Sequence, residues 1–485
     1  MAGSAILRRA RLRHYPGMML PKPARLAALT ALAALVPAAA RADAVRDLVT
    51  AEMARSMTPG IAIAVVGPDG TGRVEGFGQA NIEHAVPVHA DTLFKTGAVG
   101  MQFTAAAIML LAEDGKIDLD APVSRYLRQA PVKWARVTVR QLLTHTSGLP
   151  ATPNGDFRAD YTNDQLLALI GAQDLNFPAG SRWRFSYAGY IVLGFVIEAV
   201  TGEHWSKFMA RRLFMPLGMT SARGIEELRI IPNRAAGYEV RDGALRNAEW
   251  ISQTANSTAD GSVYVSALDY AAWAEALAAR RLLAPGSWTA MAGSARLADG
   301  SVCAYVPGWA VGGAPGRTMW TQQGSWQGFQ SYSLRFPDRN LTVAVFANGE
   351  QADVGRLARA VAGQVDAEVA LPPAAPLANA DAAQTARVRA WLAAIAGGRA
   401  RPQDFADYAK LDFTELTQLH AGTLAGLGAL EDLALFARSK SCGSDQLRYR
   451  ARYAKGLVDV RLALTSDGRI ADLDIAPLTA WDDPL

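Results

Sequence analysis

Cysteine and histidine are scarce in this chain of 485 residues, which contains two cysteines and six histidines. Two cysteines cannot build a disulfide-rich framework. Cys303 and Cys442 lie far apart, and we expect them in different domains. They could pair in an exported protein or remain two unpaired structural thiols, and their spacing does not decide between the two. The histidines, at positions 14, 84, 89, 145, 204 and 420, show no metal-ligand spacing. We therefore predict no metal and no cofactor.

A basic surface is also lacking once the N-terminus is set aside. The formal net charge is +4, but seven basic residues and no acidic ones precede Asp43. The 42 basic residues that remain face 45 acidic ones, a net charge of −3. This balance gives no electrostatic basis for binding nucleic acid.

No segment beyond the N-terminus reaches transmembrane length without charges or turn residues. The N-terminus itself has a basic region, an apolar run over residues 26–36 and the small-residue end Ala40-Arg41-Ala42. This layout predicts a signal peptide over residues 1–42 and an exported, periplasmic or secreted protein with no membrane contact beyond that segment. An uncleaved anchor, or a true start at Met18 or Met19, stays open.

Strand patterns occur at both ends of a long first domain, residues 43–370. A helix is expected over 43–56, and the runs 61–66 and 74–79 predict a hairpin, as do 330–336 and 341–346 around a turn at 337–340. Helical patterns at 190–200 and 268–277 lie between the hairpins, and a helix over 354–365 follows them. The predicted fold class is α/β (α+β), with one antiparallel sheet flanked by helices and a helical lobe inserted into it.

A proline-rich linker, residues 371–380, leads to a smaller C-terminal domain, 381–485. Helices are expected over 383–395 and 412–419. Three alternating runs, 447–453, 457–464 and 470–475, predict a three-stranded meander. The element order is similar to that of cystatin-like or nuclear-transport-factor-like (NTF2-like) α+β modules.

We expect the first domain to be organised around the stretch from Thr92 to Gly115. Nearly every residue from 101 to 111 is apolar or alanine, which predicts a helix buried on all sides. Gly115 is expected to end it, because glycine accepts the left-handed conformation common at helix C-termini.

Three runs carry a family resemblance. They are Phe94-Lys95-Thr96-Gly97-Ala98-Val99-Gly100-Met101-Gln102-Phe103-Thr104-Ala105-Ala106-Ala107, Gly115-Lys116-Ile117-Asp118-Leu119-Asp120-Ala121-Pro122-Val123 and Leu142-Leu143-Thr144-His145-Thr146-Ser147-Gly148-Leu149-Pro150. Together they resemble the serine β-lactamase and penicillin-binding-protein-like family, including its class C β-lactamase-related members, over about residues 44–370. The resemblance implies the same sheet and inserted lobe.

The functional motifs of that family are altered here. Ala98 stands where the family has its acylated serine, and Met101 where it has the lysine that takes the serine's proton. An alanine supplies no nucleophile and a thioether accepts no proton. No Ser-x-x-Lys or Gly-x-Ser-x-Gly occurs elsewhere in the chain.

The second and third motifs depart in the same direction. In Trp183-Arg184-Phe185-Ser186-Tyr187-Ala188-Gly189-Tyr190, Phe185 takes the place of the family's tyrosine and Tyr187 that of its asparagine. A two-residue slip would instead make Tyr187 the catalytic tyrosine. On the strand beside the nucleophile position, Gln322 and Gly324 match a Lys-Thr-Gly-type motif with the cation replaced by a neutral amide.

Other polar residues near the inferred cleft have plainer roles. His145 and Ser147 are interpreted as structural, and Lys95 is not expected to act as a base. The run 259–262 is expected to shape the cleft floor. Trp320 and Trp326 are expected to pack at its core or rim, with an aromatic wall for a ligand as the alternative. The hydroxyls expected to serve caps or turns are Thr96, Ser186 and Ser325.

The combined loss predicts a pseudoenzyme, an exported family member that binds a peptide or cell-wall-derived ligand without catalysis. The main alternative is an active hydrolase of β-lactams, esters or D-amino-acid peptides with a rearranged site that recruits Tyr187. A third hypothesis is a scaffold protein whose C-terminal domain does the binding.

Overall fold

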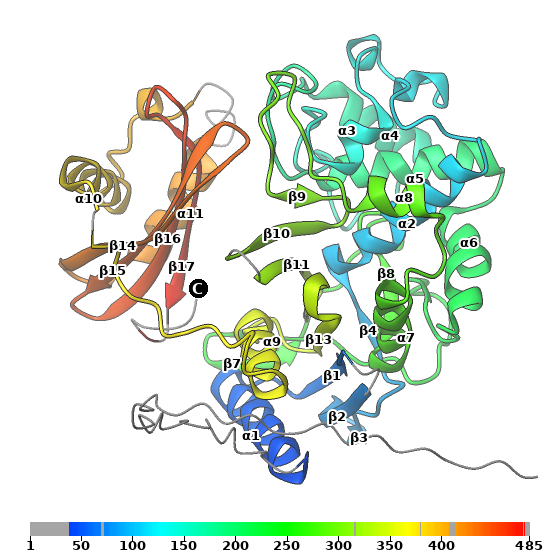
Figure 1. Ribbon diagram of the computed structural model, residues 1–485, viewed down its shortest axis with the longest axis horizontal. Helices are drawn as coiled ribbons and strands as arrows, with labels where there is room; N and C mark the ends of the chain where they lie inside the picture. Colours follow the sequence, from blue (N-terminus) through cyan, green and yellow to red (C-terminus); the bar gives the residue numbers. More distant parts are fainter. Residues whose placement is uncertain are drawn as a thin grey trace, which may run out of the picture.

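The computed structural model describes residues 38–68, 72–314, 317–378, 380–406, 413–478 and 480. The predicted signal peptide lies outside these residues except for 38–42, which begin helix α1. Residue 379 of the predicted linker, and 407–412, 479 and 481–485 of the predicted C-terminal domain, also lie outside them. Figure 1 shows a larger unit (residues 38–370) and, in dark yellow through orange to red, a C-terminal unit (residues 382–478) beside it.

An eight-stranded antiparallel sheet organises the larger unit, in the order β3-β2-β1-β13-β12-β11-β10-β9. Strand β1 pairs with β13, so strands from the two ends of the unit lie side by side, as the sequence predicted. Both predicted hairpins, β1–β2 and β12–β13, are confirmed. The strands are β1 (Gly60–Val66), β2 (Gly72–Asn81), β3 (Val86–Pro87), β9 (Tyr305–Val306), β10 (Trp309–Ala314), β11 (Arg317–Trp326), β12 (Phe329–Phe336) and β13 (Leu341–Ala347).

Helices cover both faces of this sheet because its central strands are apolar on both sides. Ile61, Ile63 and Val65 of β1 pack in one core with α1 (Ala38–Ser56) and α9 (Val354–Val365). The alternate residues Ala62, Ala64 and Val66 belong to the other core, which is shared with the helical lobe. Because successive strand residues point to opposite faces, β1 contacts the helices on both sides of the sheet.

The lobe is formed by the chain between β3 and β9, which confirms the predicted insertion. Among the described residues, no helix combines the length and apolar character needed to cross a membrane. The lobe's elements are β4 (Leu93–Lys95), α2 (Met101–Glu113), α3 (Val139–Leu143), α4 (Asn163–Ala172), α5 (Tyr187–Thr201), α6 (Trp205–Met209), β5 (Arg223–Gly224), β6 (Tyr238–Arg241), β7 (Ala244–Asn247), β8 (Val263–Ser266), α7 (Ala267–Ala278) and α8 (Pro285–Met291).

Helix α2 is buried along its length from Met101 to Leu111, as predicted. A 3₁₀ turn, η1 (Gly97–Gly100), precedes it and connects it to strand β4. Gly115, with a φ of +68°, follows its C-terminus. This left-handed glycine lets the chain leave the helix without a Cβ clash.

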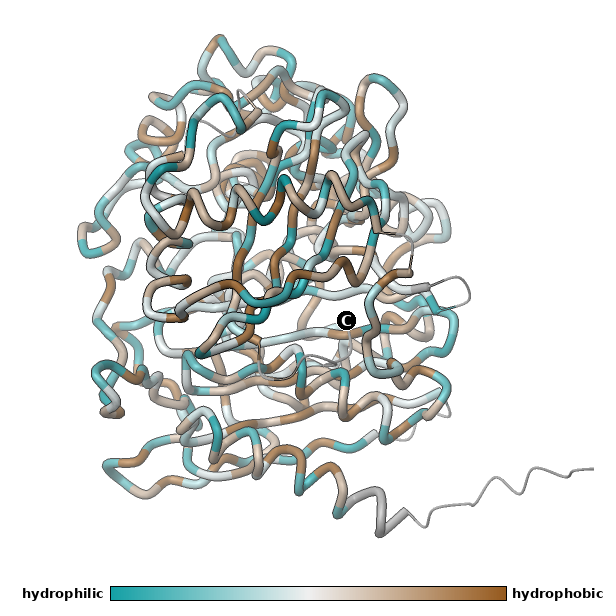
Figure 2. Tube along the Cα trace, turned by 90° about the vertical axis from the view of Figure 1, so that its left-hand side faces the viewer, coloured by the Kyte–Doolittle hydropathy of each residue, from teal (hydrophilic) through white to brown (hydrophobic). Residues whose placement is uncertain are grey.

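The C-terminal unit has its own core between two helices and an antiparallel sheet of order β14-β15-β16-β17. The predicted three-stranded meander is therefore wrong by one strand, β14. Two register shifts interrupt β14, so its side chains do not alternate cleanly. Figure 2 views the molecule from this unit's side. The elements are α10 (Ala382–Ala396), α11 (Phe413–Leu424), β14 (Leu430–Ser441), β15 (Ser444–Tyr453), β16 (Gly456–Leu464) and β17 (Ile470–Leu478).

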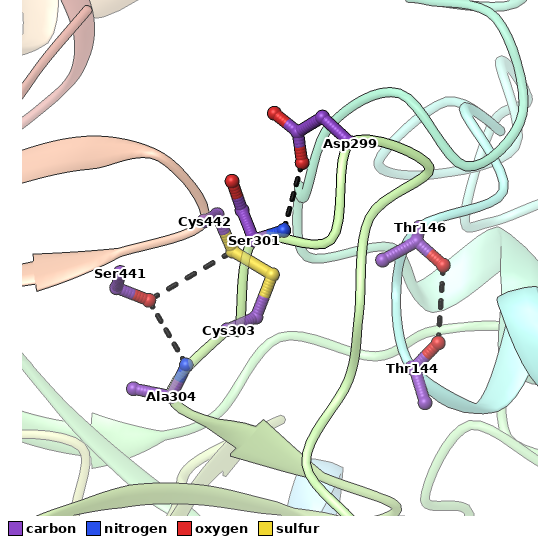
Figure 3. Close-up of a disulfide and its surroundings, with 8 residues drawn as sticks. All are labelled: Thr144, Thr146, Asp299, Ser301, Cys303, Ala304, Ser441 and Cys442. Carbon is purple, nitrogen blue, oxygen red and sulfur yellow. Dashed lines mark hydrogen bonds between the residues drawn. A yellow bond between two sulfur atoms is a disulfide. The ribbon is translucent and has the colours of Figure 1, made fainter.

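A disulfide between Cys303 and Cys442 joins the two units (Figure 3). It links the segment before β9 to the turn between β14 and β15. Beside it, the Cys442 amide donates to the Val302 carbonyl at 2.9 Å, and the Ala304 amide donates to Ser441 Oγ at 2.9 Å. The two cysteines are thus paired and belong to different units.

Candidate functional site

A cavity of about 350 Å³, hereafter the cleft, lies where η1, α5 and the end of β11 meet two loops. The loops are residues 152–161 and 254–262. The lining residues are Gly97, Ala98, Thr152, Pro153, Gly155, Asp156, Phe157, Ala159, Tyr161, Leu166, Tyr187, Ile191, Thr254, Ala255, Thr258, Asp260, Gly261, Ser262, Ser325 and Trp326. The cleft thus lies beside η1, the turn that precedes the central helix α2.

Ala98 lies at the cleft wall, and strand β11 packs tightly behind it. A Cβ added at Gly324 would lie 2.0 Å from the Thr96 carbonyl oxygen and 2.9 Å from the Ala98 nitrogen. A Cβ at Gly97 would lie 2.7 Å from the Ser325 nitrogen. Because neither glycine carries a side chain, η1 and β11 approach backbone to backbone. At Ala98, the position where the family resemblance predicts a nucleophile, the cleft wall carries only a methyl group.

Met101 and Gln322 do not belong to the described lining. Met101 is fully buried in the core of the lobe. Gln322 is also buried, and its Nε2 donates to the Gln323 carbonyl at 3.3 Å. Neither residue offers a base or a cation to the cleft.

Phe185 and Tyr187 diverge at the start of helix α5. Between them, Ser186 caps the helix: its Oγ accepts from the Gly189 amide at 3.0 Å and donates to the Pro150 carbonyl at 2.6 Å. Tyr187 lines the cleft, whereas Phe185 packs against His145 with ring centroids 4.4 Å apart. Phe185 instead lines a second cavity, of about 460 Å³, which the C-terminal unit helps to enclose. Of these two aromatic residues, Tyr187 is therefore the one that lines the cleft.

His145 has the structural role that its sequence context predicted. Its Nε2 lies 3.0 Å from the Tyr305 hydroxyl, and its Nδ1 accepts from the Ser186 amide at 3.2 Å. Burial lowers the pKa of His145 to about 3, so the ring is neutral at physiological pH. Ser147 likewise serves its own turn, where its Oγ accepts from the Leu149 amide at 3.2 Å.

Thr96 and Ser325 also use their hydroxyls for structure. Thr96 Oγ1 lies 2.9 Å from the Gly261 carbonyl and 3.1 Å from that of Val263. Ser325 Oγ accepts from Gln330 Nε2 at 3.1 Å. Neither hydroxyl has a basic partner in these contacts that would activate it as a nucleophile.

Asp260 is the residue that the sequence interpretation undervalued. The run 259–262 was expected at the cleft floor, and Asp260, Gly261 and Ser262 all line the cleft. Burial raises the pKa of the Asp260 carboxyl to about 6, a rise that a hydrogen bond from the Thr258 side chain partly offsets. Burial and the nearby Asp260 raise the pKa of the Tyr187 hydroxyl as well. Tyr187 is therefore a hydrogen-bond donor at neutral pH and a poor base.

Trp326 forms one wall of the cleft and is held from behind. Its Nε1 donates to Asn256 Oδ1 at 2.8 Å, and the same oxygen accepts from Lys95 Nζ at 3.2 Å. Lys95 is 5 % exposed and forms an ion pair with Glu227. Burial lowers the pKa of Lys95, and Glu227 opposes this effect. Lys95 therefore braces the wall and is not part of the lining.

Comparison with known proteins shows the family and the fold of this chain. A family model described as Beta-lactamase matches residues 45–367. The chain is 27 % identical over 296 residues to Penicillin-binding protein 4* of Bacillus subtilis (strain 168), covering 57 % of this chain and 65 % of that protein. It thus spans slightly less than two thirds of that relative's length.

Two solved structures share the fold. The D-amino acid amidase from Ochrobactrum anthropi SV3, complexed with L-phenylalanine amide, is 21 % identical with a TM-score of 0.59, covering 68 % of this chain and 99 % of that one. The octameric penicillin-binding protein homologue from Pyrococcus abyssi is also 21 % identical, with a TM-score of 0.58, covering 90 % of this chain and 96 % of that one.

Proposed function

Because this chain belongs to the Beta-lactamase family, we propose that it is an exported, non-catalytic binding protein of that family. Its cleft binds a small ligand such as a peptide or a cell-wall fragment and leaves the ligand chemically unchanged. The observation that carries the proposal is the pair of positions at the start of the central helix, a methyl group at Ala98 and a thioether buried in the core at Met101.

Acyl transfer requires an oxygen or sulfur nucleophile and a base within hydrogen-bond reach. Removing the nucleophile or its base from a serine hydrolase costs on the order of 10⁶ in turnover. The Ser325 hydroxyl, which lines the cleft, and the buried Thr96 hydroxyl beside η1 both have structural partners, and the Gln322 amide cannot act as a base. The cavity itself persists, and this favours a retained binding role over chemistry.

The alternative, an active hydrolase with a rearranged site, is favoured by one observation. Tyr187 and Asp260 both line the cleft. Against it, the raised pKa of Tyr187 makes a phenolate rare at neutral pH. A neutral phenol is a weak nucleophile, so binding remains the better account.

Export is supported by the signal-peptide layout of residues 1–42 and by the Cys303–Cys442 disulfide. Disulfides form and persist mainly in oxidising compartments, such as the periplasm. We expect cleavage after Ala42.

One experiment tests both parts. The full chain is expressed in a Gram-negative host, and periplasmic protein is exposed to a fluorescent penicillin, chromogenic esters and D-phenylalanine amide before intact-mass analysis. We expect a mass that begins at Asp43, no acyl adduct and no turnover. An adduct on any residue would overturn the binding role, and turnover that disappears in Tyr187→Phe would establish the rearranged hydrolase. A full-length protein that stays in the cytoplasm would contradict export.

A further inference from the structure

The charge and surface of the cleft indicate which ligands it accepts. Its described lining contains two carboxyl groups, Asp156 and Asp260, and no lysine, arginine or histidine. Four aromatic residues share the lining, namely Phe157, Tyr161, Tyr187 and Trp326. A cavity with this composition is apolar and aromatic with a negative electrostatic bias.

Among the described residues that line the cleft, Asp260 has no cation beside it that would neutralise it. The groups around it are the Thr258 hydroxyl on its own loop and the Tyr187 hydroxyl on α5. From the facing loop come Asp156 and Tyr161, while η1 and the end of β11 contribute no titratable side chain to the lining. The carboxylate is therefore ionised above pH 6 without a charged protein partner, in a site where burial makes that charge costly.

Two basic residues that adjoin the cleft, Lys95 and Arg158, each form an ion pair with a glutamate. Lys95 lies behind Trp326 and Asn256 and is bound to Glu227. Arg158, on the outer side of the loop, pairs with Glu249 and lines a neighbouring cavity. Neither is among the residues that line the cleft, so the negative bias of the lining is not cancelled locally.

The indole of Trp326 is oriented by its own contacts. Its N–H is committed to Asn256, and Phe157 meets it edge to face with ring centroids 5.9 Å apart. An indole whose donor is satisfied offers a ligand its π surface and not its hydrogen bond. That surface attracts cations and apolar groups.

We propose that the ligand of the cleft is an organic cation, an ammonium group on an apolar or aromatic body. Asp260 pairs with the ammonium, and the wall of Trp326 and Phe157 packs on the body. This inference rests on the proposed binding function and narrows it. A ligand recognised through a carboxylate is excluded from the same place, because its charge would meet Asp260 and Asp156 without a partner.

The test is isothermal titration of the full-length mature protein with small probes. Benzyltrimethylammonium carries a permanent charge, and phenylacetate is an anion of similar size. Choline and 3,3-dimethylbutan-1-ol form a matched pair that differs mainly in charge. At pH 7.5 we expect both cations to bind at millimolar concentration, choline about tenfold or more tightly than its neutral analogue, and phenylacetate not at all.

Asp260→Asn should weaken cation binding about tenfold, and so should lowering the pH to 5, where the carboxyl of Asp260 is protonated and the probes keep their charge. Asp174→Asn is the matched control, because it removes the same charge from a side chain that is 97 % exposed and lies outside the cleft. It should leave binding unchanged.

Each other outcome has a definite meaning. Cation binding that is indifferent to Asp260→Asn, a preference for phenylacetate, or no cation binding at millimolar concentration overturns the proposed ligand class. A preference for phenylacetate would do so while leaving a non-catalytic binding protein in place. Only acylation or turnover in the mass experiment would remove the binding function itself.

Discussion

At the scale of single residues, the chemistry of the cleft follows from a few substitutions whose meaning depends on position. The prediction that Ala98 and Met101 stand at the family's nucleophile and base positions comes from the sequence, where the flanking Phe94 and Phe103-Thr104 fix the register of the family motif. Asp260 could not be assigned a role. A lone acidic residue before a glycine resembles a turn, and its electrostatic weight arises only when α5 and η1 enclose it.

The burial of Asp260 leads to a prediction about stability. The carboxyl has an ordinary pKa of 3.8 and a pKa of about 6 in the folded protein, so the folded state binds the proton more tightly. Stability from this group is full below pH 4 and is lost as the pH rises to about 6. A pKa difference of one unit between the folded and unfolded states corresponds to about 1.4 kcal/mol of folding free energy.

We therefore expect Asp260→Asn to raise the free energy of unfolding by about 3 kcal/mol at pH 8, with no difference from the wild type near pH 4. Urea denaturation at pH 4, 6 and 8 measures this. An equal effect of the substitution at all three pH values would mean that the carboxylate is not destabilised in the folded protein. If Asp260→Asn both stabilises the protein and weakens cation binding, Asp260 lowers the stability of the folded protein and strengthens its binding of the ligand.

At the scale of elements, the cleft depends on how closely β11 approaches η1. Gly324→Ala would place a Cβ 2.0 Å from the Thr96 carbonyl oxygen and 2.6 Å from Ser331 Oγ. The first contact is with backbone and cannot be relieved by a rotamer change. We expect a loss of about 1–3 kcal/mol in unfolding free energy, the usual cost of overpacking, together with weaker cation binding.

Denaturation followed by tryptophan fluorescence measures the loss. Gly286→Ala is the control, because a Cβ at this position in the first turn of α8 would meet no atom within 4 Å. Its stability should equal or slightly exceed that of the wild type. Equal tolerance of both substitutions would refute the tight contact between β11 and η1.

Helices and strands could be predicted where the sequence pattern is regular. The prediction failed where contacts between distant residues determine the structure. The predicted runs 330–336 and 341–346, and the apolar run of α2, gave nearly the observed bounds of β12, β13 and α2. Strand β14 was missed because its two register shifts break the alternation. The divergence of Phe185 and Tyr187 was equally hidden, since it depends on the Ser186 cap contacting Pro150, far along the chain.

At the scale of the whole molecule, the Cys303–Cys442 disulfide connects the C-terminal unit to the larger unit. The C-terminal unit contributes no described residue to the lining of the cleft. Around the disulfide, the units share two hydrogen bonds and the second cavity, which Phe185, Cys442 and Asp472 help to line. The other covalent connection is the proline-rich linker after residue 370. The cross-link therefore restrains how far the C-terminal unit can move.

We expect Cys303→Ser/Cys442→Ser, or reduction of the wild type, to speed proteolysis within residues 371–378 and to lower the unfolding midpoint. Closing a loop of more than 100 residues stabilises a folded protein by about 3–5 kcal/mol in the chain-entropy view. Limited proteolysis with and without dithiothreitol measures the first effect, and the double serine variant, which has no disulfide, should not respond to the reductant. Cation binding should persist, because the cleft residues all precede residue 371. If binding disappeared together with the disulfide, the C-terminal unit would have to shape the cleft through the second cavity, and Phe185 packed against Tyr187 would be the route.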